Sequence, residues 1–137
     1  GGWSGPNVVD VYVLSADPLG SPPSGSRARR AAHDRPRRTL LYVPGGAFIT
    51  HFLLADLFFL MRWVATTRVT VVYVLYDTAP QHPFPHALSQ CFTAYAALCQ
   101  AGASGDRCAL GFVPALPVAM AGLSAGGNLA SALMLVL

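Results

Sequence analysis

The stretch PVAMAGLSAG, residues 117–126, joins an apolar, strand-like segment to a Gly-x-Ser-x-Gly pentapeptide. Residues 128–137 have a helical composition, so the pentapeptide lies between a predicted strand and a predicted helix, the context in which this motif is specific. A strand that turns sharply into a helix leaves no room for side chains two residues before or after the serine, which explains the two glycines. The pattern predicts a strained, exposed Ser124 at the edge of a sheet. Taken alone, it would equally suit a glycine-rich helix cap without chemistry.

Short apolar runs alternate with longer helix-like segments over the rest of the chain. Strands are predicted at residues 8–14, 39–43, 69–75 and 117–121, and helices at residues 53–66, 86–100 and 128–137. This alternation is typical of a parallel sheet covered by helices on both faces. The run VTVVYVL at 69–75 is almost wholly apolar, as expected for a central strand. We therefore expect an α/β protein with three layers, α/β/α, and a mostly parallel sheet.

The composition favours one globular domain. Hydrophobic residues make up 53% of the 137 residues and charged residues only 11%, which is far from a disordered composition. Residues 15–38 differ, because they concentrate Pro, Ser and six of the nine arginines, and we interpret them as a mobile loop. Nucleic-acid binding would also need a basic face on a folded scaffold, so no nucleic-acid partner is predicted.

Cysteine usage and hydropathy bear on the compartment. Cys91, Cys99 and Cys108 are an odd number without a Cys-x-x-Cys pair, so reduced thiols in a cytoplasmic protein are the expectation, and no secretory signal is visible. Residues 109–137 carry no charge and exceed the length of a membrane span. Prolines and glycines interrupt this stretch, however, so no stable membrane span is predicted.

Two further segments carry recognisable motifs. PGGAF at 44–48 follows a predicted strand, and YDTAPQHPFPHAL at 76–88 links the central strand to the next helix. They resemble the HGGG-F loop and the Y-x-L-A-P-E-x-P-F-P-A-A-L segment of the hormone-sensitive-lipase-like esterases, the α/β hydrolase fold-3 family. GLSAGGNLA at 122–130 is similar to that family's G-D-S-A-G-G-N-L-A. The three ordered motifs fall within residues 40–137, and we expect residues 39–137 to be the recognisable hydrolase core of a partial domain that spans residues 1–137.

The resemblance implies a carboxylic ester hydrolase of the esterase or lipase type. Ser124 would be its nucleophile, and the backbone amides of Gly46, Ala47 and Ala125 would form the oxyanion hole. A small-molecule ester is the expected partner, and neither a cofactor nor a metal is expected. The sequence does not predict the oligomeric state.

The chain departs from the family pattern at several positions. Pro44 replaces the motif histidine, Leu123 replaces an aspartate in the pentapeptide, and Gln81 replaces a glutamate. Triad residues in this fold follow the order Ser, then Asp or Glu, then His, yet no acid or histidine follows Ser124. We expect an N-terminal fragment, truncated after the helix that follows Ser124, with negligible turnover of its own. The alternatives are a non-catalytic remnant or binding module of the same fold and, last, a membrane-associated protein.

The histidines all precede Ser124 and match no family base. His82 and His86 are four residues apart, but Pro83 and Pro85 exclude the helix that would bring both rings to one metal, so a metal site is not predicted there. The pair is expected in a bend, with His86 near a helix N-terminus. His51 follows the glycine-rich loop and is expected on the surface or in packing, with a pocket-lining role as the alternative.

Overall fold

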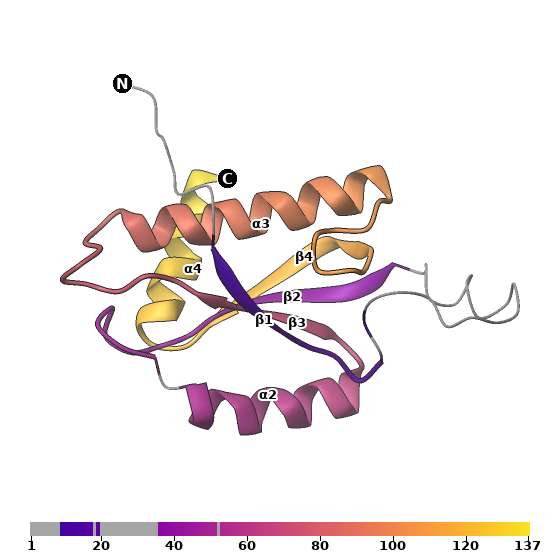
Figure 1. Ribbon diagram of the computed structural model, residues 1–137, viewed down its shortest axis with the longest axis horizontal. Helices are drawn as coiled ribbons and strands as arrows, with labels where there is room; N and C mark the ends of the chain where they lie inside the picture. Colours follow the sequence, from indigo (N-terminus) through magenta and orange to yellow (C-terminus); the bar gives the residue numbers. More distant parts are fainter. Residues whose placement is uncertain (1–8, 18, 20–35, 52) are drawn as a thin grey trace, which may run out of the picture.

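A computed structural model describes residues 9–17, 19, 36–51 and 53–137. Within them one sheet has the strand order β1-β3-β2-β4, and its strands are β1 (Asp10–Leu14), β2 (Arg37–Val43), β3 (Thr70–Leu75) and β4 (Pro114–Gly122). β2 is parallel to both β3 and β4, whereas β1 is antiparallel to β3. The described helices are α2 (Leu53–Thr67), α3 (His86–Ser104) and α4 (Ala125–Val136) (Figure 1). The prediction of a mostly parallel sheet is confirmed.

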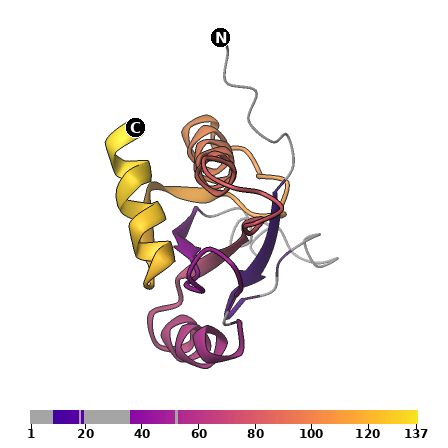
Figure 2. The ribbon, with the colours of Figure 1, turned by 90° about the vertical axis from the view of Figure 1, so that its left-hand side faces the viewer.

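Helices cover both faces of this sheet (Figure 2). Successive residues of β2 and β3 point to opposite faces, as the two-residue period of a strand requires. The residues on one face pack with α3 and α4. The buried residues of this core include Leu41, Val43, Val72, Val74, Leu88, Leu98, Leu129 and Leu133. The residues on the other face pack with α2. The buried residues of this second core are Leu40, Tyr42, Leu60, Val64, Val71 and Tyr73. The predicted three-layer α/β/α arrangement is therefore confirmed.

Most predicted elements exist, with shifted boundaries. β2 begins at Arg37, inside the predicted loop at 15–38, because the Arg37 amide donates to the carbonyl of Val113 at 2.8 Å. Most of that loop lies outside the described residues, as does Val8 of the first predicted strand. β4 is longer than predicted and contains Pro114 and Pro117. Pro117 is tolerated because β4 is an outer strand and its pairing with β2 shifts register there.

The helix predicted to stop before Gly102 continues to Ser104. Gly105, at φ 72°, ends it in the left-handed conformation, and its amide donates to the carbonyl of Ala101. Gly102 instead permits close packing on β4, because a Cβ there would lie 3.0 Å from the Pro114 carbonyl oxygen. The glycine that ends α3 is therefore Gly105, and the predicted end at residue 100 is four residues too early.

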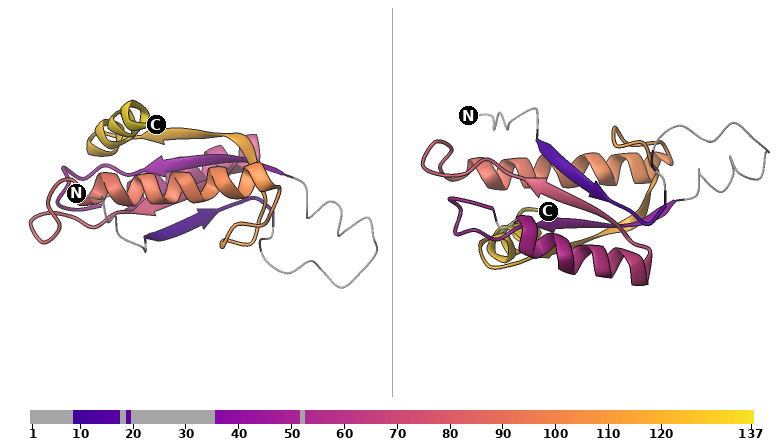
Figure 3. Two further views of the ribbon diagram at one scale, coloured as in Figure 1. Left: turned by 90° about the horizontal axis from the view of Figure 1, so that it is seen from above. Right: turned by 60° about the horizontal axis from the view of Figure 1, so that its bottom comes forward.

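The loops that follow β2, β3 and β4 meet at one edge of the sheet (Figure 3). These strands are parallel, so their carboxyl ends lie together, which is where α/β folds place their ligand sites. The segment 44–51, the segment 76–85 and Ser124 all lie at this edge. No helix among the described residues combines the length and apolarity needed to cross a membrane.

Candidate active site

Ser124 lies in the sharp turn between β4 and α4. Its backbone has φ 53° and ψ −119°, a conformation that costs a non-glycine residue roughly 1–3 kcal/mol. The Leu123 carbonyl accepts from the Gly126 amide at 2.8 Å, and the Ser124 carbonyl accepts from the Asn128 amide at 3.1 Å. The side chain is exposed and makes no capping hydrogen bond. The predicted strain and exposure of Ser124 are both present.

Two glycines make this turn possible. A Cβ on Gly122 would lie 2.3 Å from the Gly126 carbonyl oxygen, and a Cβ on Gly126 would lie 2.0 Å from the Val43 carbonyl oxygen. Both distances are far below van der Waals contact, so any side chain would force the backbone apart. The Leu123 amide also donates to the Val43 carbonyl at 3.3 Å. The turn is thereby held tightly against the end of β2.

The loop after β2 packs beside the turn. A Cβ on Gly45 would lie 3.3 Å from the Cβ of Ser124. Gly46 has φ 135°, and its carbonyl accepts from the amides of Ile49 and Thr50 at 3.0 Å each. Ala47 and Phe48 follow with φ values of 53° and 65°, so two non-glycine residues adopt the left-handed conformation. Ala47 therefore fits where the family has glycine, at a cost in backbone strain.

Tyr76 supports this loop, a contact that the sequence did not reveal. Its hydroxyl donates to the Pro44 carbonyl at 3.1 Å, and burial raises the pKa of Tyr76 to about 12. The Ala79 amide also donates to the Phe48 carbonyl at 2.8 Å. These two bonds tie the segment 76–85 to the loop 44–51. They give the loop an anchor although it lacks the motif histidine.

Three amides at this edge remain unpaired within the described part of the chain. Those of Gly46, Ala47 and Ala125 donate no hydrogen bond to any described residue. Ala125 is the first residue of α4, so its amide belongs to the positive end of the helix dipole. Unpaired amides of this kind can stabilise a negative oxygen.

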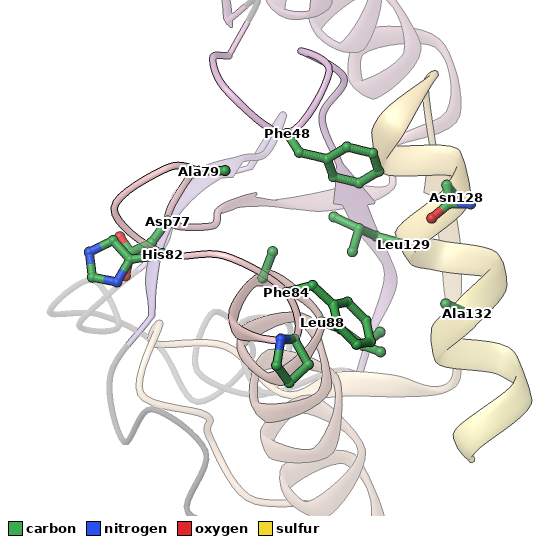
Figure 4. A pocket seen from close by; sticks show the side chains of 11 residues that line it. Phe48, Asp77, Ala79, His82, Phe84, Leu88, Asn128, Leu129 and Ala132 are labelled. Atoms are coloured by element: carbon green, nitrogen blue, oxygen red, sulfur yellow. The ribbon is translucent and has the colours of Figure 1, made fainter.

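A cavity of about 280 Å³ opens next to the turn, and its wall is mainly apolar. Figure 4 shows its lining, which comes from the loops after β2 and β3, from α3 and from α4: Phe48, Asp77, Ala79, His82, Phe84, Pro85, Ala87, Leu88, Asn128, Leu129 and Ala132. Ser124 is not one of these residues, but Asn128, one helical turn further, is. The cavity can hold a small apolar group close to the serine.

Comparison with known proteins agrees with this geometry. A sequence profile described as the alpha/beta hydrolase fold matches residues 40–137. The chain belongs to the α/β hydrolase fold family. Over 110 residues it is 32% identical to mouse hormone-sensitive lipase, a match that covers 75% of this chain and 13% of the lipase. An esterase of Acinetobacter venetianus is 31% identical over 96 residues, which are 70% of this chain and 28% of the esterase. The chain spans only 13% and 28% of the length of these two relatives.

Solved esterase structures share the hydrolase fold. An esterase from the archaeon Pyrobaculum calidifontis superposes with a TM-score of 0.67 at 23% identity, over 93% of this chain and 35% of the esterase. An esterase from Mycobacterium marinum superposes with a TM-score of 0.62 at 30% identity, over 91% of this chain and 33% of the esterase. The chain thus spans about a third of the length of these esterases.

No described histidine lies in hydrogen-bond contact with the Ser124 hydroxyl of this hydrolase chain. His51 packs edge-on against Tyr76, with ring centroids 4.9 Å apart, so the packing role predicted for it is confirmed. Its buried Nε2 atom has no partner among the described residues.

His82 and His86 lie at the bend before α3, as predicted, yet their rings are neighbours. His86 is the first residue of α3, as expected, and the ring centroids are 4.6 Å apart. The prolines do exclude a helix, but a turn brings the rings together instead. The carbonyl of Pro83 accepts from the His86 amide at 3.1 Å within this turn.

Asp77 makes two side-chain hydrogen bonds to residues of α3. Its Oδ2 atom lies 2.9 Å from Nε2 of His86 and accepts from Nε2 of Gln90 at 3.0 Å. The hydrogen bond with His86, chiefly, holds the pKa of Asp77 below its usual range. The two residues are nine positions apart, and β3 and α3 bring them together.

Proposed function

We propose that Ser124 is the nucleophile of a carboxylic ester hydrolase. The observation that carries this proposal is the positive φ of Ser124, held between two glycines whose positions admit no Cβ. Strain of this kind persists only where the surroundings enforce it, and it is concentrated at functional sites. Membership of a family that includes lipases and esterases supports the same reaction class.

In the proposed reaction the Ser124 hydroxyl oxygen attacks the ester carbonyl carbon while its proton passes to a general base. The amides of Gly46, Ala47 and Ala125 would stabilise the negative oxygen of the tetrahedral intermediate. Collapse of the intermediate breaks the bond to the alcohol, which leaves with a proton and gives an acyl-enzyme. Water then hydrolyses the acyl-enzyme and returns a proton to the serine.

The substrate is proposed to be a small ester with an apolar group. Phe48, Phe84 and Leu129 contribute to the apolar wall of the cavity beside α4. Burial of an apolar acyl or alcohol group there would supply binding free energy at roughly 25 cal/mol per Å² removed from water. The polar groups on the wall, Asp77, His82 and Asn128, would lie around it.

The lack of an identified base for the Ser124 proton limits the ester turnover expected of this chain. Residues 125–137 contain no acid and no histidine, and no described histidine contacts Ser124. In serine hydrolases that lack a triad member, the oxyanion hole and binding still leave about 10³–10⁴-fold catalysis over water. We therefore expect slow acylation of Ser124 by an activated ester, without steady turnover.

Mass spectrometry tests this expectation. The chain is incubated for hours with p-nitrophenyl acetate or a fluorophosphonate, and the modified residue is located by peptide mapping. Adduct on Ser124, absent in Ser124→Ala and retained in Ser131→Ala, is the expected result. Ser131 is a matched control, because it is an exposed serine in α4 whose hydroxyl donates to the Gly127 carbonyl.

The second candidate is a binding module that keeps the pocket without chemistry, and the absence of a contact between any described histidine and Ser124 favours it. A chain folded by circular dichroism but unmodified at Ser124 would support the module and contradict the nucleophile. Steady ester turnover that disappears in Ser124→Ala would instead contradict the expectation that the chain lacks a working base.

A further inference from the structure

Three side chains that commonly bind metals meet in the segment that joins β3 to α3. One ligand atom each from Asp77, His82 and His86 lies within 4.8 Å of the other two. The imidazole rings are neighbours, and Nε2 of His86 is 2.9 Å from Oδ2 of Asp77. No other group of three such residues was found in the described part of the chain.

The fold holds this cluster in place at several points. Asp77 follows shortly after β3, and His86 begins α3, so two rigid elements fix two of the three residues. His82 lies between them in a turn where its amide donates to the Thr78 carbonyl at 3.0 Å. The cluster therefore does not depend on a single flexible loop.

Gln90 orients the carboxylate of this cluster. Its side chain is buried at 2% exposure and makes two hydrogen bonds to Asp77, one from its Nε2 atom to Oδ2 and one from the Asp77 amide to its Oε1 atom at 2.7 Å. Metal-binding carboxylates in proteins are commonly held by outer hydrogen bonds of this kind.

The cluster is a feature of this chain and not of the family motif. In the pattern Y-x-L-A-P-E-x-P-F-P-A-A-L, the positions of Asp77 and His82 are variable and alanine stands where this chain has His86. The family motif therefore does not account for the cluster, although Asp77 and His82 also line the cavity of the proposed function.

We propose that Asp77, His82 and His86 bind a divalent transition-metal ion of the zinc class. Two imidazole nitrogens and one carboxylate suit zinc, whereas calcium and magnesium prefer oxygen ligands. Neighbouring ligand atoms around tetrahedral zinc are about 3.3 Å apart, given bonds of about 2.0–2.1 Å. Nε2 of His86 and Oδ2 of Asp77, now 2.9 Å apart, would separate slightly, and rotation of the solvent-exposed His82 would adjust the remaining separations, which lie within 4.8 Å.

The position of the site gives the ion a role. Asp77 and His82 both line the cavity beside α4, so the ion would lie in its wall (Figure 4). Three protein ligands leave a fourth position open for water or for a carboxylate of a bound molecule. The ion would also fasten the end of β3 to the start of α3. Neither effect requires Ser124 to be a nucleophile.

Metal titration of the full chain, prepared without a histidine tag, tests the proposal. Zinc is titrated against a fluorescent chelator, and cobalt(II) is used as a probe because its visible absorption reports the coordination geometry. We expect one zinc per chain and a cobalt spectrum of nitrogen and oxygen ligands. His82→Ala, His86→Ala and Asp77→Asn should each weaken binding by about tenfold or more.

His33→Ala is the control, because it removes a histidine that the proposed site does not use and should leave the affinity unchanged. Circular dichroism checks the folding of each variant. If His86→Ala disturbs folding because His86 begins α3, His82→Ala decides the test, since His82 is exposed. Absence of saturable binding, or equal affinity in His82→Ala, would overturn the proposal. An equal loss in His33→Ala would also overturn it, since binding would then follow the number of histidines in the chain.

Discussion

Gly126 and Gly127 are adjacent in α4 but face different surroundings. A Cβ on Gly126 would lie 2.0 Å from the Val43 carbonyl oxygen, whereas a Cβ on Gly127 would lie 3.2 Å from the Gly122 carbonyl oxygen. We expect Gly126→Ala to lower the free energy of unfolding by about 3 kcal/mol or more through backbone overlap. Gly127→Ala should change it by less than about 1 kcal/mol, because better helix propensity offsets the tight contact. Urea denaturation of both variants measures the difference, and equal effects would contradict the close approach of α4 to β2.

Asp77 gives a pH dependence whose sign follows from its lowered pKa. A carboxyl whose pKa is lower in the folded state stabilises the fold above its unfolded pKa, and this contribution is lost as the pH falls through the folded pKa. The side chain is 47% exposed, so the contribution should stay under about 1 kcal/mol. Carbon-13 NMR titration should give a pKa below 3.8 for Asp77 and a higher one in His86→Ala. An unchanged value in that variant would assign the lowered pKa to His82 and Gln90 instead.

At the scale of elements, a buried hydrogen bond joins β3 to α2. The Tyr73 hydroxyl donates to Oδ2 of Asp56 at 3.3 Å, and burial, followed by the charge of Asp56, raises the pKa of Tyr73. Tyr73→Phe should lower the free energy of unfolding by about 1–3 kcal/mol, because it leaves a buried acceptor unsatisfied. Tyr12→Phe in β1 is the control, since Tyr12 is half-exposed. Thermal unfolding compares the two variants, and a harmless Tyr73→Phe would mean that water replaces the hydroxyl.

Apolar surface is prominent at the scale of the whole molecule. Leu54 and Phe58 on the outer side of α2 are 74% and 80% exposed, and β4 is an outer strand of the described sheet. Exposed apolar patches and unpaired strand edges promote association. We expect concentration-dependent light scattering by the isolated chain, reduced in Phe58→Lys with little change in stability. Leu60→Ala, at a wholly buried position of the same helix, should instead cost about 2–5 kcal/mol in stability. Equal scattering by wild type and Phe58→Lys would exclude the α2 face as the cause.

The sequence by itself determined the fold class and the strained serine. Apolar runs predict strands and helices because the spacing of apolar residues is a local property of the sequence. The pentapeptide predicts the turn at Ser124 because both of the glycines that the turn needs lie within the same five residues. The ends of the elements were predicted less accurately. Gly102 lies within α3 because it packs against β4, and Arg37 belongs to β2 because its amide donates to the Val113 carbonyl. Signals of this kind depend on partners far along the chain.

Only the tertiary structure decided which side chains meet. Tyr76 reaches the Pro44 carbonyl across 32 positions of sequence, and Gln90 reaches Asp77 across 13. The cluster of Asp77, His82 and His86 formed although the local argument from proline excluded it, because a turn between β3 and α3 replaces the helix. Local propensity governs the conformation of a few consecutive residues. Contacts between segments depend on how the sheet and its helices bring distant parts of the chain together, and the composition of one segment does not contain that information.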